Sequence, residues 1–524
     1  MLDTVLSIIF RLTALFGYTL AMTYYMHMFQ LNSYHANVQI KWLGENFTGA
    51  YLVRVFPALI SLIAIFIPTI NIFGVAIPAG IILATLANIS FFIRHLPQKA
   101  KKPLVFTARV KRMIVTFVIL SVLIIVPVAH FSGMLFVYSA ILFLPCFVII
   151  LANFANKPVE KAVGNHYINQ AKAKINALPN LIVIGITGSY GKTSTKFYLQ
   201  KLLSSKYNVL MTPESYNTTM GVVKTVREML DATYDIFICE MGAKNVGEIK
   251  EICDIVKPKY GIITSIGPAH LESFKSMENI VKTKFELCDA LPEDGIIFLN
   301  GDNQYIANHT PSRKAVYYGT ENNNLEKVFG DNISVSDKGT SFTAHTETDS
   351  FDYDTSILGK HSVVNILGCV AVARFLGCDA KQLVLPIKRL ETAPHRLQLR
   401  GGGEVTIIDD AFNSNPSGSK AALDVLSAFD GIRIMITPGM VELGDKEEQY
   451  NREFGEYAAD KCDYVLLVGE RITKSIAQGL RNKNYPDDKC ITFAKVTEAI
   501  AYAKALEYGK KKYILLENDL PDNY

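Results

Sequence analysis

The chain divides into two parts according to the spacing of its hydrophobic residues. Up to residue 156, long apolar stretches with few charges are separated by short polar breaks. Val55 to Ile93 and Met113 to Asn156 contain no formally charged residue, and each is interrupted once, around Pro68 to Pro78 and at His130 to Gly133. Apolar stretches of this length are typical of membrane-spanning helices. With Thr4 to Tyr25 as a further candidate, they predict a membrane region over 1–156 with about five transmembrane helices.

After residue 156 the pattern changes to short apolar strands that alternate with amphipathic helices. Residues 157–180 read as a helical linker, and 181–392 as a central α/β domain with a mostly parallel sheet. The strands are predicted at Ile182–Ile186, Asn208–Met211, Asp235–Glu240, Tyr260–Thr264 and Gly295–Leu299. The helices between them are predicted at Gly221–Leu230, Val246–Val256 and Met277–Ala290.

The last part of the chain predicts antiparallel hairpins and then a smaller domain. Tyr305 to Leu358 is polar and alternating, which favours hairpins at the side of the central domain. A hinge is expected at Thr392 to Pro394. Residues 393–524 then read as a Rossmann-like α/β domain, with strands expected at Val405–Asp409, Arg433–Thr437, Asp463–Val468, Cys490–Phe493 and Tyr513–Glu517.

Charge is distributed as unevenly as hydrophobicity. The first 159 residues hold eleven Lys and Arg but only Asp3 and Glu45 as acids, a net charge of +9 in a chain of +4. Such a basic, apolar part joined to a mildly acidic one favours a membrane-attached enzyme and argues against a nucleic-acid partner. The loop Arg94 to Arg112 has seven bases and no acid, so the positive-inside rule places this loop in the cytoplasm. Counting the predicted spans from there places everything after Phe154 in the cytoplasm as well. The eight cysteines are scattered, which fits reduced thiols.

The stretch LIVIGITGSYGKTST, Leu181 to Thr195, has the order strand, glycine-rich turn, helix. Gly188 and Gly191 allow the backbone to turn tightly, so that its N–H groups can surround phosphate oxygens at the helix N-terminus. Lys192 would neutralise the β- and γ-phosphates and Thr193 would reach Mg²⁺. The strict spacing requires glycine at 186, where this chain has Ile186, so the alternative is a strand–helix turn that binds no nucleotide.

Further polar residues follow the ends of neighbouring strands, where ligands bind in α/β folds. Glu240 ends a strand in ICEMGA, His270 follows another in GPAHLE, and Lys282 and Lys284 lie on the next helix. Together they could organise Mg²⁺ and an anionic substrate. Taken singly, Glu240 could cap a helix and His270 could be a loop histidine with its hydrogen bonds satisfied. Lys282 and Lys284 could be solvated.

The order and spacing of these motifs resemble the Mur ligase family from Leu181 to Tyr524. The matching elements are TGSYGKTS, ESYNTTMG, CEMGA, AHLESF, KTKFE, LNGDN, GKHSVVN, APHR and DDAFNSNP. EMGA, AHLESF and DDAFNSNP suggest the branch that adds D-alanyl-D-alanine to the muramoyl tripeptide. One departure is Ser362, which stands where the family motif of His361 and Asn365 has its first asparagine.

The resemblance implies roles for individual residues. Thr193, Glu240, His270 and Lys284 would be metal ligands, with Lys284 carbamylated by CO₂. Lys192, Lys284, His270 and Arg396 would be catalytic. ATP would contact Thr187, Gly188, Ser189, Gly191, Lys192, Thr193, Ser194, Asn303, Asn365, Arg396 and Asp410, with Asn303 and Asn365 by the adenine, Asp410 by the ribose and Arg396 by the γ-phosphate. TPGMVELGD, Thr437 to Asp445, is either part of the cleft or a structural turn.

The implied activity is ATP- and Mg²⁺-dependent amide-bond formation in peptidoglycan precursor synthesis, through an acyl phosphate. The amine would be an amino acid or dipeptide, and the acceptor a peptide or sugar-peptide. Membrane helices here replace the family's soluble UDP-binding domain, so a lipid-linked acceptor is expected as an alternative. Two alternatives are a membrane-bound ligase that builds or modifies polyglutamate or another lipid-linked envelope polymer, and a membrane scaffold that senses ATP. The expected location is the plasma membrane, multi-pass, with cytoplasmic catalytic domains.

Overall fold

The computed structural model describes residues 2–72, 75–96, 102–132, 135–214, 216–321, 327–336, 338–412, 415–506 and 509–519. Ser215, Asn413 and Ser414, which belong to motifs named above, lie outside these ranges, as does Gly133 of the predicted turn. The chain forms two compact units that divide between Asn165 and His166. Each unit is built around its own hydrophobic core.

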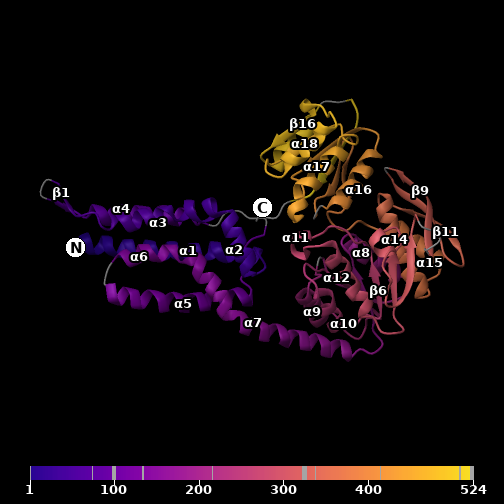
Figure 1. Ribbon diagram of the computed structural model, residues 1–524, viewed down its shortest axis with the longest axis horizontal. Helices are drawn as coiled ribbons and strands as arrows, with labels where there is room; N and C mark the ends of the chain where they lie inside the picture. The colour runs from indigo at the N-terminus through magenta and orange to yellow at the C-terminus, as the bar shows by residue number, and fades with distance from the viewer. Residues whose placement is uncertain are drawn as a thin grey trace. The chain divides into compact units, whose positions relative to one another are not determined.

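The first unit is helical. Its elements are α1 (Leu2–Leu31), α2 (Ala36–Glu45), a π-helical turn (Phe47–Leu52), α3 (Val53–Ala64), the short hairpin β1 (Ile70–Ile72) and β2 (Val75–Ile77), α4 (Ala79–Arg94), α5 (Ala108–Ser132), α6 (Phe136–Ala140), a 3₁₀ turn (Ile141–Phe143) and α7 (Pro145–Asn176). Helices α3 and α4 run side by side in Figure 1. Small residues allow this close approach, since a Cβ on Gly80 would lie 2.5 Å from the carbonyl oxygen of Ala64.

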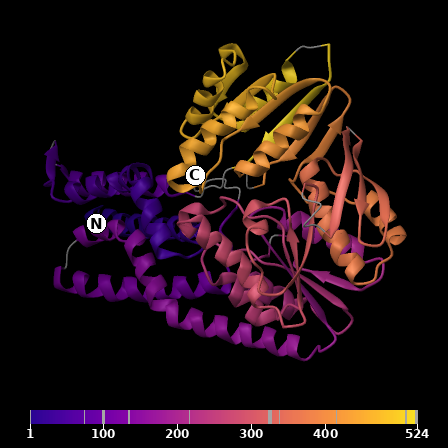
Figure 2. The ribbon, with the colours of Figure 1, turned by 45° about the vertical axis from the view of Figure 1, so that its right-hand side comes forward.

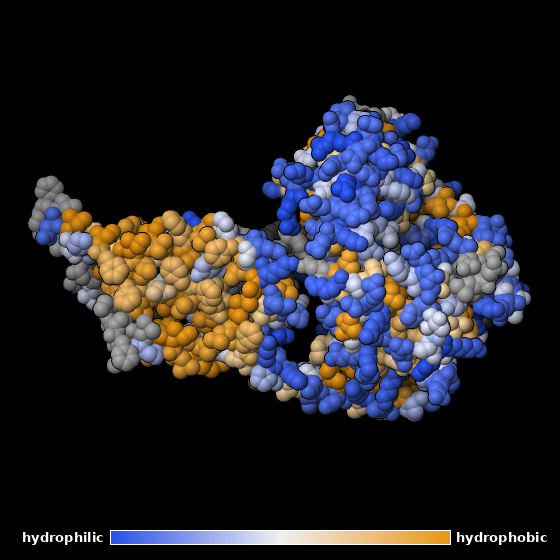
Figure 3. Space-filling model, viewed as in Figure 1, coloured by the Kyte–Doolittle hydropathy of each residue, from blue (hydrophilic) through white to orange (hydrophobic). Residues whose placement is uncertain are grey.

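The face of this unit that Figure 3 shows is mostly apolar, with orange side chains over most of its length. Leu12, Ile63 and Leu123 are each 60% or more exposed, and they come from three different helices. Exposed apolar surface of this extent is typical of regions that contact a membrane or another protein.

The structure bears out the predicted helical spans in part. Within the described ranges, three helices are long and apolar enough to cross a membrane: Thr4–Leu31, Phe47–Ala64 and Ala108–Pro127. A fourth span results if Phe136–Phe143 and Pro145–Asn176, which meet at 61°, act as one. Helix α4 has 16 residues, fewer than the roughly 20 that a straight span needs. Length and composition therefore support three or four of the roughly five predicted spans within the described residues, and the total number stays a prediction.

Helix α7 also differs from the predicted linker, because one helix of 32 residues covers both the end of the apolar region and most of 157–180. Pro158 lies inside it without ending it. The helix loses its apolar pattern along its length, which is the change that we read as a boundary. A helix can continue through such a change because its backbone hydrogen bonds do not depend on side-chain polarity.

The second unit begins with a nine-stranded sheet in the order β11-β10-β9-β8-β7-β6-β3-β5-β4. Its strands are β3 (Ile182–Thr187), β4 (Val209–Met211), β5 (Ile236–Glu240), β6 (Tyr260–Ile263), β7 (Ile296–Asn300), β8 (Lys314–Gly319), β9 (Val328–Ser336), β10 (Gly339–His345) and β11 (Ser350–Thr355). The strands from β4 to β9 pair in parallel, and β9, β10 and β11 pair antiparallel. The predicted hairpins therefore exist, and they extend the central sheet, which makes it mixed.

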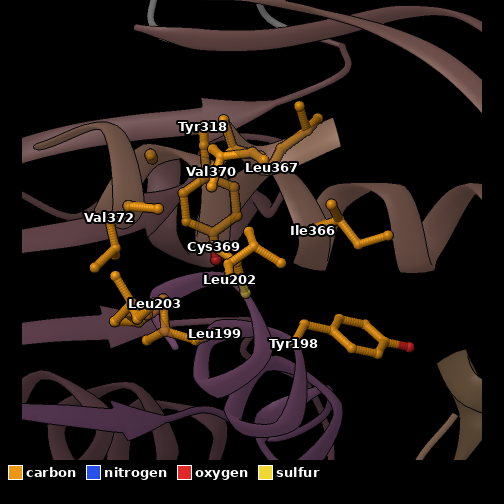
Figure 4. Close-up of a cluster of buried hydrophobic side chains, with 14 of the residues drawn as sticks. Tyr198, Leu199, Leu202, Leu203, Tyr318, Ile366, Leu367, Cys369, Val370 and Val372 are labelled. Atoms are coloured by element: carbon orange, nitrogen blue, oxygen red, sulfur yellow. The ribbon is translucent and has the colours of Figure 1, made fainter. Parts of the chain in front are cut away.

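Helices cover both faces of this sheet. They are α8 (Lys192–Leu203), α9 (Thr219–Glu228), α10 (Glu248–Val256), α11 (Leu271–Phe274), α12 (Met277–Asp289), α13 (Gln304–Ala307), α14 (Lys360–Phe375) and α15 (Ala380–Lys388). Figure 4 shows one of the two cores, where Leu199, Leu202 and Leu203 of α8 lie on one side of Tyr318 of β8, and Leu367 and Val370 of α14 lie next to its ring. Helices α9, α10 and α12 pack on the opposite face of the sheet. This packing fixes the start of α8, where the phosphate loop ends.

The rest of the unit is a six-stranded sheet in the order β12-β13-β17-β14-β15-β16, visible in Figure 2 between its helices. Its elements are β12 (Gln398–Gly402), β13 (Val405–Asp410), α16 (Pro416–Ser427), β14 (Ile432–Thr437), α17 (Glu447–Ala458), β15 (Tyr464–Val468), α18 (Thr473–Asn482), β16 (Cys490–Phe493), α19 (Val496–Ala505) and β17 (Lys512–Glu517). The five predicted strands are confirmed. Edge strand β12, which pairs antiparallel with β13, was not predicted, because it contains two glycines and a charge.

Candidate active site

The glycine-rich loop connects the carboxyl end of β3 to the N-terminus of α8. Gly188 has φ +152° and Gly191 has φ +80°, where side chains are disfavoured. A Cβ on Gly188 would lie 2.1 Å from Oγ1 of Thr264, and one on Gly191 would lie 2.8 Å from Oδ1 of Asn365. Glycine is therefore required at both positions, although Ile186 breaks the strict motif.

Hydrogen bonds to the loop after β6 fix the shape of the phosphate loop. The Ser189 amide donates to the Ser265 carbonyl at 2.7 Å, and the Tyr190 amide donates to Oγ of Ser265 at 3.0 Å. Ser189 Oγ donates to the Gly267 carbonyl at 2.9 Å. Thr187, which is buried, donates its hydroxyl to the Met241 carbonyl at 2.9 Å. The predicted nucleotide contacts Thr187, Gly188, Ser189 and Gly191 thus form one tightly bonded turn.

Glu240 is the centre of a buried polar network at the start of α8. Its Oε1 accepts hydrogen bonds from Thr193 Oγ1 and Asn217 Nδ2, both at 3.0 Å, and its Oε2 lies 2.9 Å from Nζ of Lys196. Burial alone would raise the pKa of Glu240, but the charges of Lys196 and Lys192 and the hydrogen bonds outweigh it, so the pKa is lowered. The carboxylate is therefore ionised beside the phosphate loop.

Lys192 and Arg396 concentrate positive charge at the same place. Lys192 Nζ donates to the carbonyls of Gly188 and Ser189 at 2.8 and 3.2 Å, so it curls over the loop. Burial lowers its pKa to about 8; the Glu240 carboxylate opposes this shift and the Arg396 charge adds to it. Arg396 lies 4.6 Å over the ring of Phe412, and burial lowers its pKa as well. The central and C-terminal domains therefore bring both predicted phosphate-binding cations together.

Lys284 is buried in α12 and differs from its neighbour Lys282, which is exposed. Burial and, to a smaller extent, the charge of Lys192 lower the pKa of Lys284 to about 7. Its Nζ lies 5.8 Å from the centre of the Phe274 ring. Within the described residues no carboxylate lies within 4.0 Å of this amine. A large fraction is therefore neutral near pH 7, which is the form that reacts with CO₂.

His270 is held by a residue of the C-terminal domain. The backbone of His270 is left-handed, with φ 53°, and its Nδ1 lies 2.5 Å from Oε2 of Glu442. Oε1 of Glu442 lies 3.0 Å from Nζ of Lys244. Burial lowers the pKa of His270, and the hydrogen bond to Glu442 offsets this only in part. The imidazole is therefore neutral, and Nδ1–H donates to the carboxylate.

The remaining predicted nucleotide contacts lie around this loop. Asn365 packs against Gly191, and Asn303 donates to the Ile266 carbonyl at 2.9 Å, so both border the phosphate loop or the loop beside it. Asp410 accepts from the Leu397 amide at 3.1 Å, and burial raises its pKa to about 6 against the opposing charge of Arg396. Ser194 lies in the first turn of α8. Contacts of these residues with adenine or ribose stay predictions.

The predicted metal ligands fit Mg²⁺ in part. Mg²⁺ prefers oxygen ligands, and Thr193 Oγ1 and Glu240 Oε1 lie together at 3.0 Å. In the described part of the chain, no group of three or more His, Cys, Asp or Glu residues is placed to hold a metal ion. His270 can offer only Nε2 while Nδ1 is bonded to Glu442, and Lys284 can contribute only as an anion. The oxygen pair is thus the part of the set that the geometry supports.

Three residues of the site were not singled out from the sequence: Lys196, Asn217 and Glu442. Lys196 lies one helical turn after Lys192, and this i, i+4 spacing was a usable signal. Asn217 and Glu442 lie inside motifs that we quoted as blocks. Their contacts depend on the approach of distant segments, which the local pattern does not show.

The site belongs to an ATP-dependent ligase fold, and comparisons with known proteins agree. The Mur ligase middle domain family matches residues 186–373, and the Mur ligase glutamate ligase domain family matches residues 395–517. The chain belongs to the Mur ligase family. Residues before 186 lie outside both matched ranges.

Individual relatives narrow the class to one branch. The Bacillus subtilis UDP-N-acetylmuramoyl-tripeptide–D-alanyl-D-alanine ligase is 31% identical over 326 residues, which are 62% of this chain and 70% of the relative. The Escherichia coli enzyme of the same name is 32% identical, over 55% of this chain and 65% of its own length, just under two thirds. MurF from Acinetobacter baumannii superposes with a TM-score of 0.63 at 26% identity, over 68% of this chain and 77% of that one. The predicted branch is therefore confirmed.

Proposed function

We propose that this protein is an ATP-dependent ligase that joins a D-alanyl-D-alanine-type dipeptide to the carboxylate of a muramoyl-peptide acceptor. The observation that carries the proposal is the assembly of Lys192, Arg396, Thr193 and Glu240 around one glycine-rich loop, in a chain whose relatives bear that activity in their names. The alternative of an ATP-sensing scaffold would not need a buried, neutral lysine beside the loop.

The side chains suit amide-bond formation by way of an acyl phosphate. Lys192 and Arg396 would stabilise negative charge on the transferring phosphoryl group. A bound Mg²⁺, held by Thr193 and Glu240, would supply Lewis-acid stabilisation of the phosphate oxygens. Lys284, once carbamylated, would place an anion near the cations. The neutral imidazole of His270 would present Nε2, since Glu442 holds Nδ1.

We further propose that the first unit embeds in the plasma membrane, with the catalytic unit on the cytoplasmic side. The apolar exterior of α1, α3 and α5 and the basic loop 94–112 support this placement. An acceptor with a lipid anchor is a second candidate. The observation that favours it is the helical unit, which lies outside the residues that match the two family domains.

The experiment is a turnover assay with purified protein in detergent or nanodiscs. ADP release is measured with ATP, Mg²⁺ and D-alanyl-D-alanine, against UDP-linked and polyprenyl-diphosphate-linked muramoyl peptides and against polyglutamate. Turnover that requires both the dipeptide and a muramoyl peptide supports the proposal. Turnover with polyglutamate and glutamate alone would instead support a ligase that extends polyglutamate.

A further inference from the structure

Two arginines meet at one end of the helical unit. Arg54 lies in the first turn of α3 and Arg94 in the last turn of α4, and the two helices pack side by side. Arg54 donates to the backbone carbonyl of Arg94, and Arg94 donates to that of Val53. These reciprocal bonds fix both residues at the same end of the helix pair.

No carboxylate among the described residues neutralises either arginine. The described carboxylates nearest in sequence, Glu45 and Glu160, pair with Lys41 and with Arg109 and Arg112. Within the described residues no carboxylate lies within 4.0 Å of Arg54 or Arg94. A guanidinium has five N–H donors, so most of the donors of this pair are not used by backbone carbonyls. The cluster is therefore able to bind an anion.

Aromatic and polar side chains shape the same place. The guanidinium of Arg54 lies 3.9 Å over the ring of Tyr24. The ring of Tyr24 is 5.9 Å from that of His95, which is 1% exposed and donates Nδ1–H to the Phe91 carbonyl at 2.9 Å. Nε2 of His95 is buried and has no hydrogen-bond partner among the described residues. Buried polar atoms without partners are rare. Because Nδ1 carries the proton, Nε2 is an acceptor, so a hydroxyl of a ligand could satisfy it and a bare phosphate oxygen could not.

The residues around the pair are apolar and exposed, which indicates what kind of anion it binds. Leu52, Val53, Phe56 and Ile93 are each between 48% and 57% exposed. A soluble phosphate would leave these side chains uncovered, whereas the acyl or prenyl chain of a lipid would cover them. Basic pockets between helices at the cytoplasmic membrane surface are a known mode of binding phosphorylated headgroups.

We propose that Arg54 and Arg94 form a binding site for the phosphate group of an anionic membrane lipid. The forked geometry of two guanidiniums suits the oxygens of a phosphomonoester or diphosphate. The site rests on the membrane insertion proposed above and does not depend on the identity of the ligase substrates. A lipid held here would stay bound to the protein during extraction with mild detergent.

The test is native mass spectrometry of the full-length protein with added phosphatidylglycerol, polyprenyl phosphate or phosphatidylcholine. Wild type is expected to retain one molecule of an anionic lipid, and R54Q/R94Q to bind it at least tenfold more weakly. The matched control is K157Q/K161Q, which removes the same charge from α7 and is expected to bind like wild type. R54K/R94K keeps the charge but loses the fork, and is expected to bind several-fold more weakly; it serves if the glutamine variant does not fold.

Three results would overturn the site: equal binding by wild type and R54Q/R94Q, equal losses in both double variants, or displacement of the lipid by equimolar inorganic pyrophosphate. The last result would point to a soluble phosphate. Membrane fractionation and ATP turnover of each variant are measured in parallel. If the wild-type protein showed no ATP turnover, the result would contradict the proposed ligase activity but not the lipid site. Lipid binding is measured independently of turnover.

Discussion

His270 and Glu442 are joined by a hydrogen bond of 2.5 Å between an imidazole of the central domain and a carboxylate of the C-terminal domain. The residues are 172 positions apart in sequence, and both have left-handed backbones, with φ 53° and 62°. Lys244 of the central domain binds the other oxygen of the same carboxylate. A carboxylate on Nδ1 fixes the tautomer and the ring orientation of a histidine that uses Nε2 as a ligand.

Replacing Glu442 by Gln should weaken metal-dependent activity without abolishing it. We expect a roughly 10- to 100-fold higher Mg²⁺ requirement, the usual cost of losing such a partner. The Mg²⁺ concentration for half-maximal ATP turnover measures it, with Glu448→Gln at an exposed position of α17 as control. Unchanged Mg²⁺ dependence in E442Q would show that the contact serves only domain packing.

The same pair predicts a dependence of stability on acid. Burial would raise the pKa of Glu442, but the hydrogen bond from His270 and the charge of Lys244 lower it from 4.5 to about 2. A lowered carboxyl pKa gives stability that is complete above pH 4.5 and is lost as the pH falls towards 2. The difference in Tm between wild type and E442Q should therefore shrink as the pH falls below 4.5 and vanish near pH 2. A difference that grew as the pH fell from 4.5 towards 2 would contradict this assignment.

Lys192→Ala should abolish ATP turnover while the protein still inserts in membranes. Lys192 curls over the phosphate loop, and losing such a cation costs on the order of 100-fold or more in rate. Lys201→Ala, an exposed position at the end of the same helix, is the control and should be near wild type. Membrane fractionation checks insertion. Normal turnover by K192A would remove the nucleotide site from this loop.

Lys284 should take up CO₂ more readily as the pH rises through about 7, because the neutral amine becomes the main form above its pKa. The ¹³C NMR signal of a carbamate, after exchange with labelled bicarbonate, measures this uptake. Lys284→Ala should lose both the signal and activity, with partial rescue by short carboxylates. Lys282→Ala should be mild because Lys282 is exposed. An active, metal-bound enzyme with Lys284 as a free amine would disprove the modification.

Breaking the Lys196–Glu240 pair should destabilise the central domain. Both side chains are 0% exposed, and removing one partner of such a pair costs about 3–5 kcal/mol. Lys196→Met should therefore lower Tm in scanning calorimetry, and the double variant K196M/E240L should recover most of the loss. Equal stability of wild type and K196M would mean that the pair is weak.

The sequence predicted the elements that local patterns specify. The β-branched run of β3, the glycines at 188 and 191, and the lysine that opens α8 follow from spacing alone, even though Ile186 breaks the strict motif. Lys282 is exposed and Lys284, two positions later on the same helix, is buried. Helical periodicity suggests that the two side chains lie on different faces, but only the structure shows which one is buried. The motif resemblance added Arg396 and Asp410, which no local pattern would place at the loop.

The rest depends on tertiary contacts. Glu442 reaches His270 only because two domains meet, and Lys196 meets Glu240 only because β5 lies beside β3. The extent of α7 was missed because polarity changes along a helix that does not end. Helix α4 is shorter than the apolar stretch around it suggests, because apolar composition does not fix the length of a helix.

The hydrogen bonds that tie the glycine-rich turn to the segment after β6 have a kinetic consequence. Ser189 and Tyr190 are already anchored by Ser265, and Lys192 is already folded onto the turn. Little conformational entropy remains to be lost when a triphosphate arrives, so capture is a docking event that needs no loop ordering. Association with ATP should therefore proceed in a single fast phase, and discrimination among nucleotides should fall to the residues that meet the base.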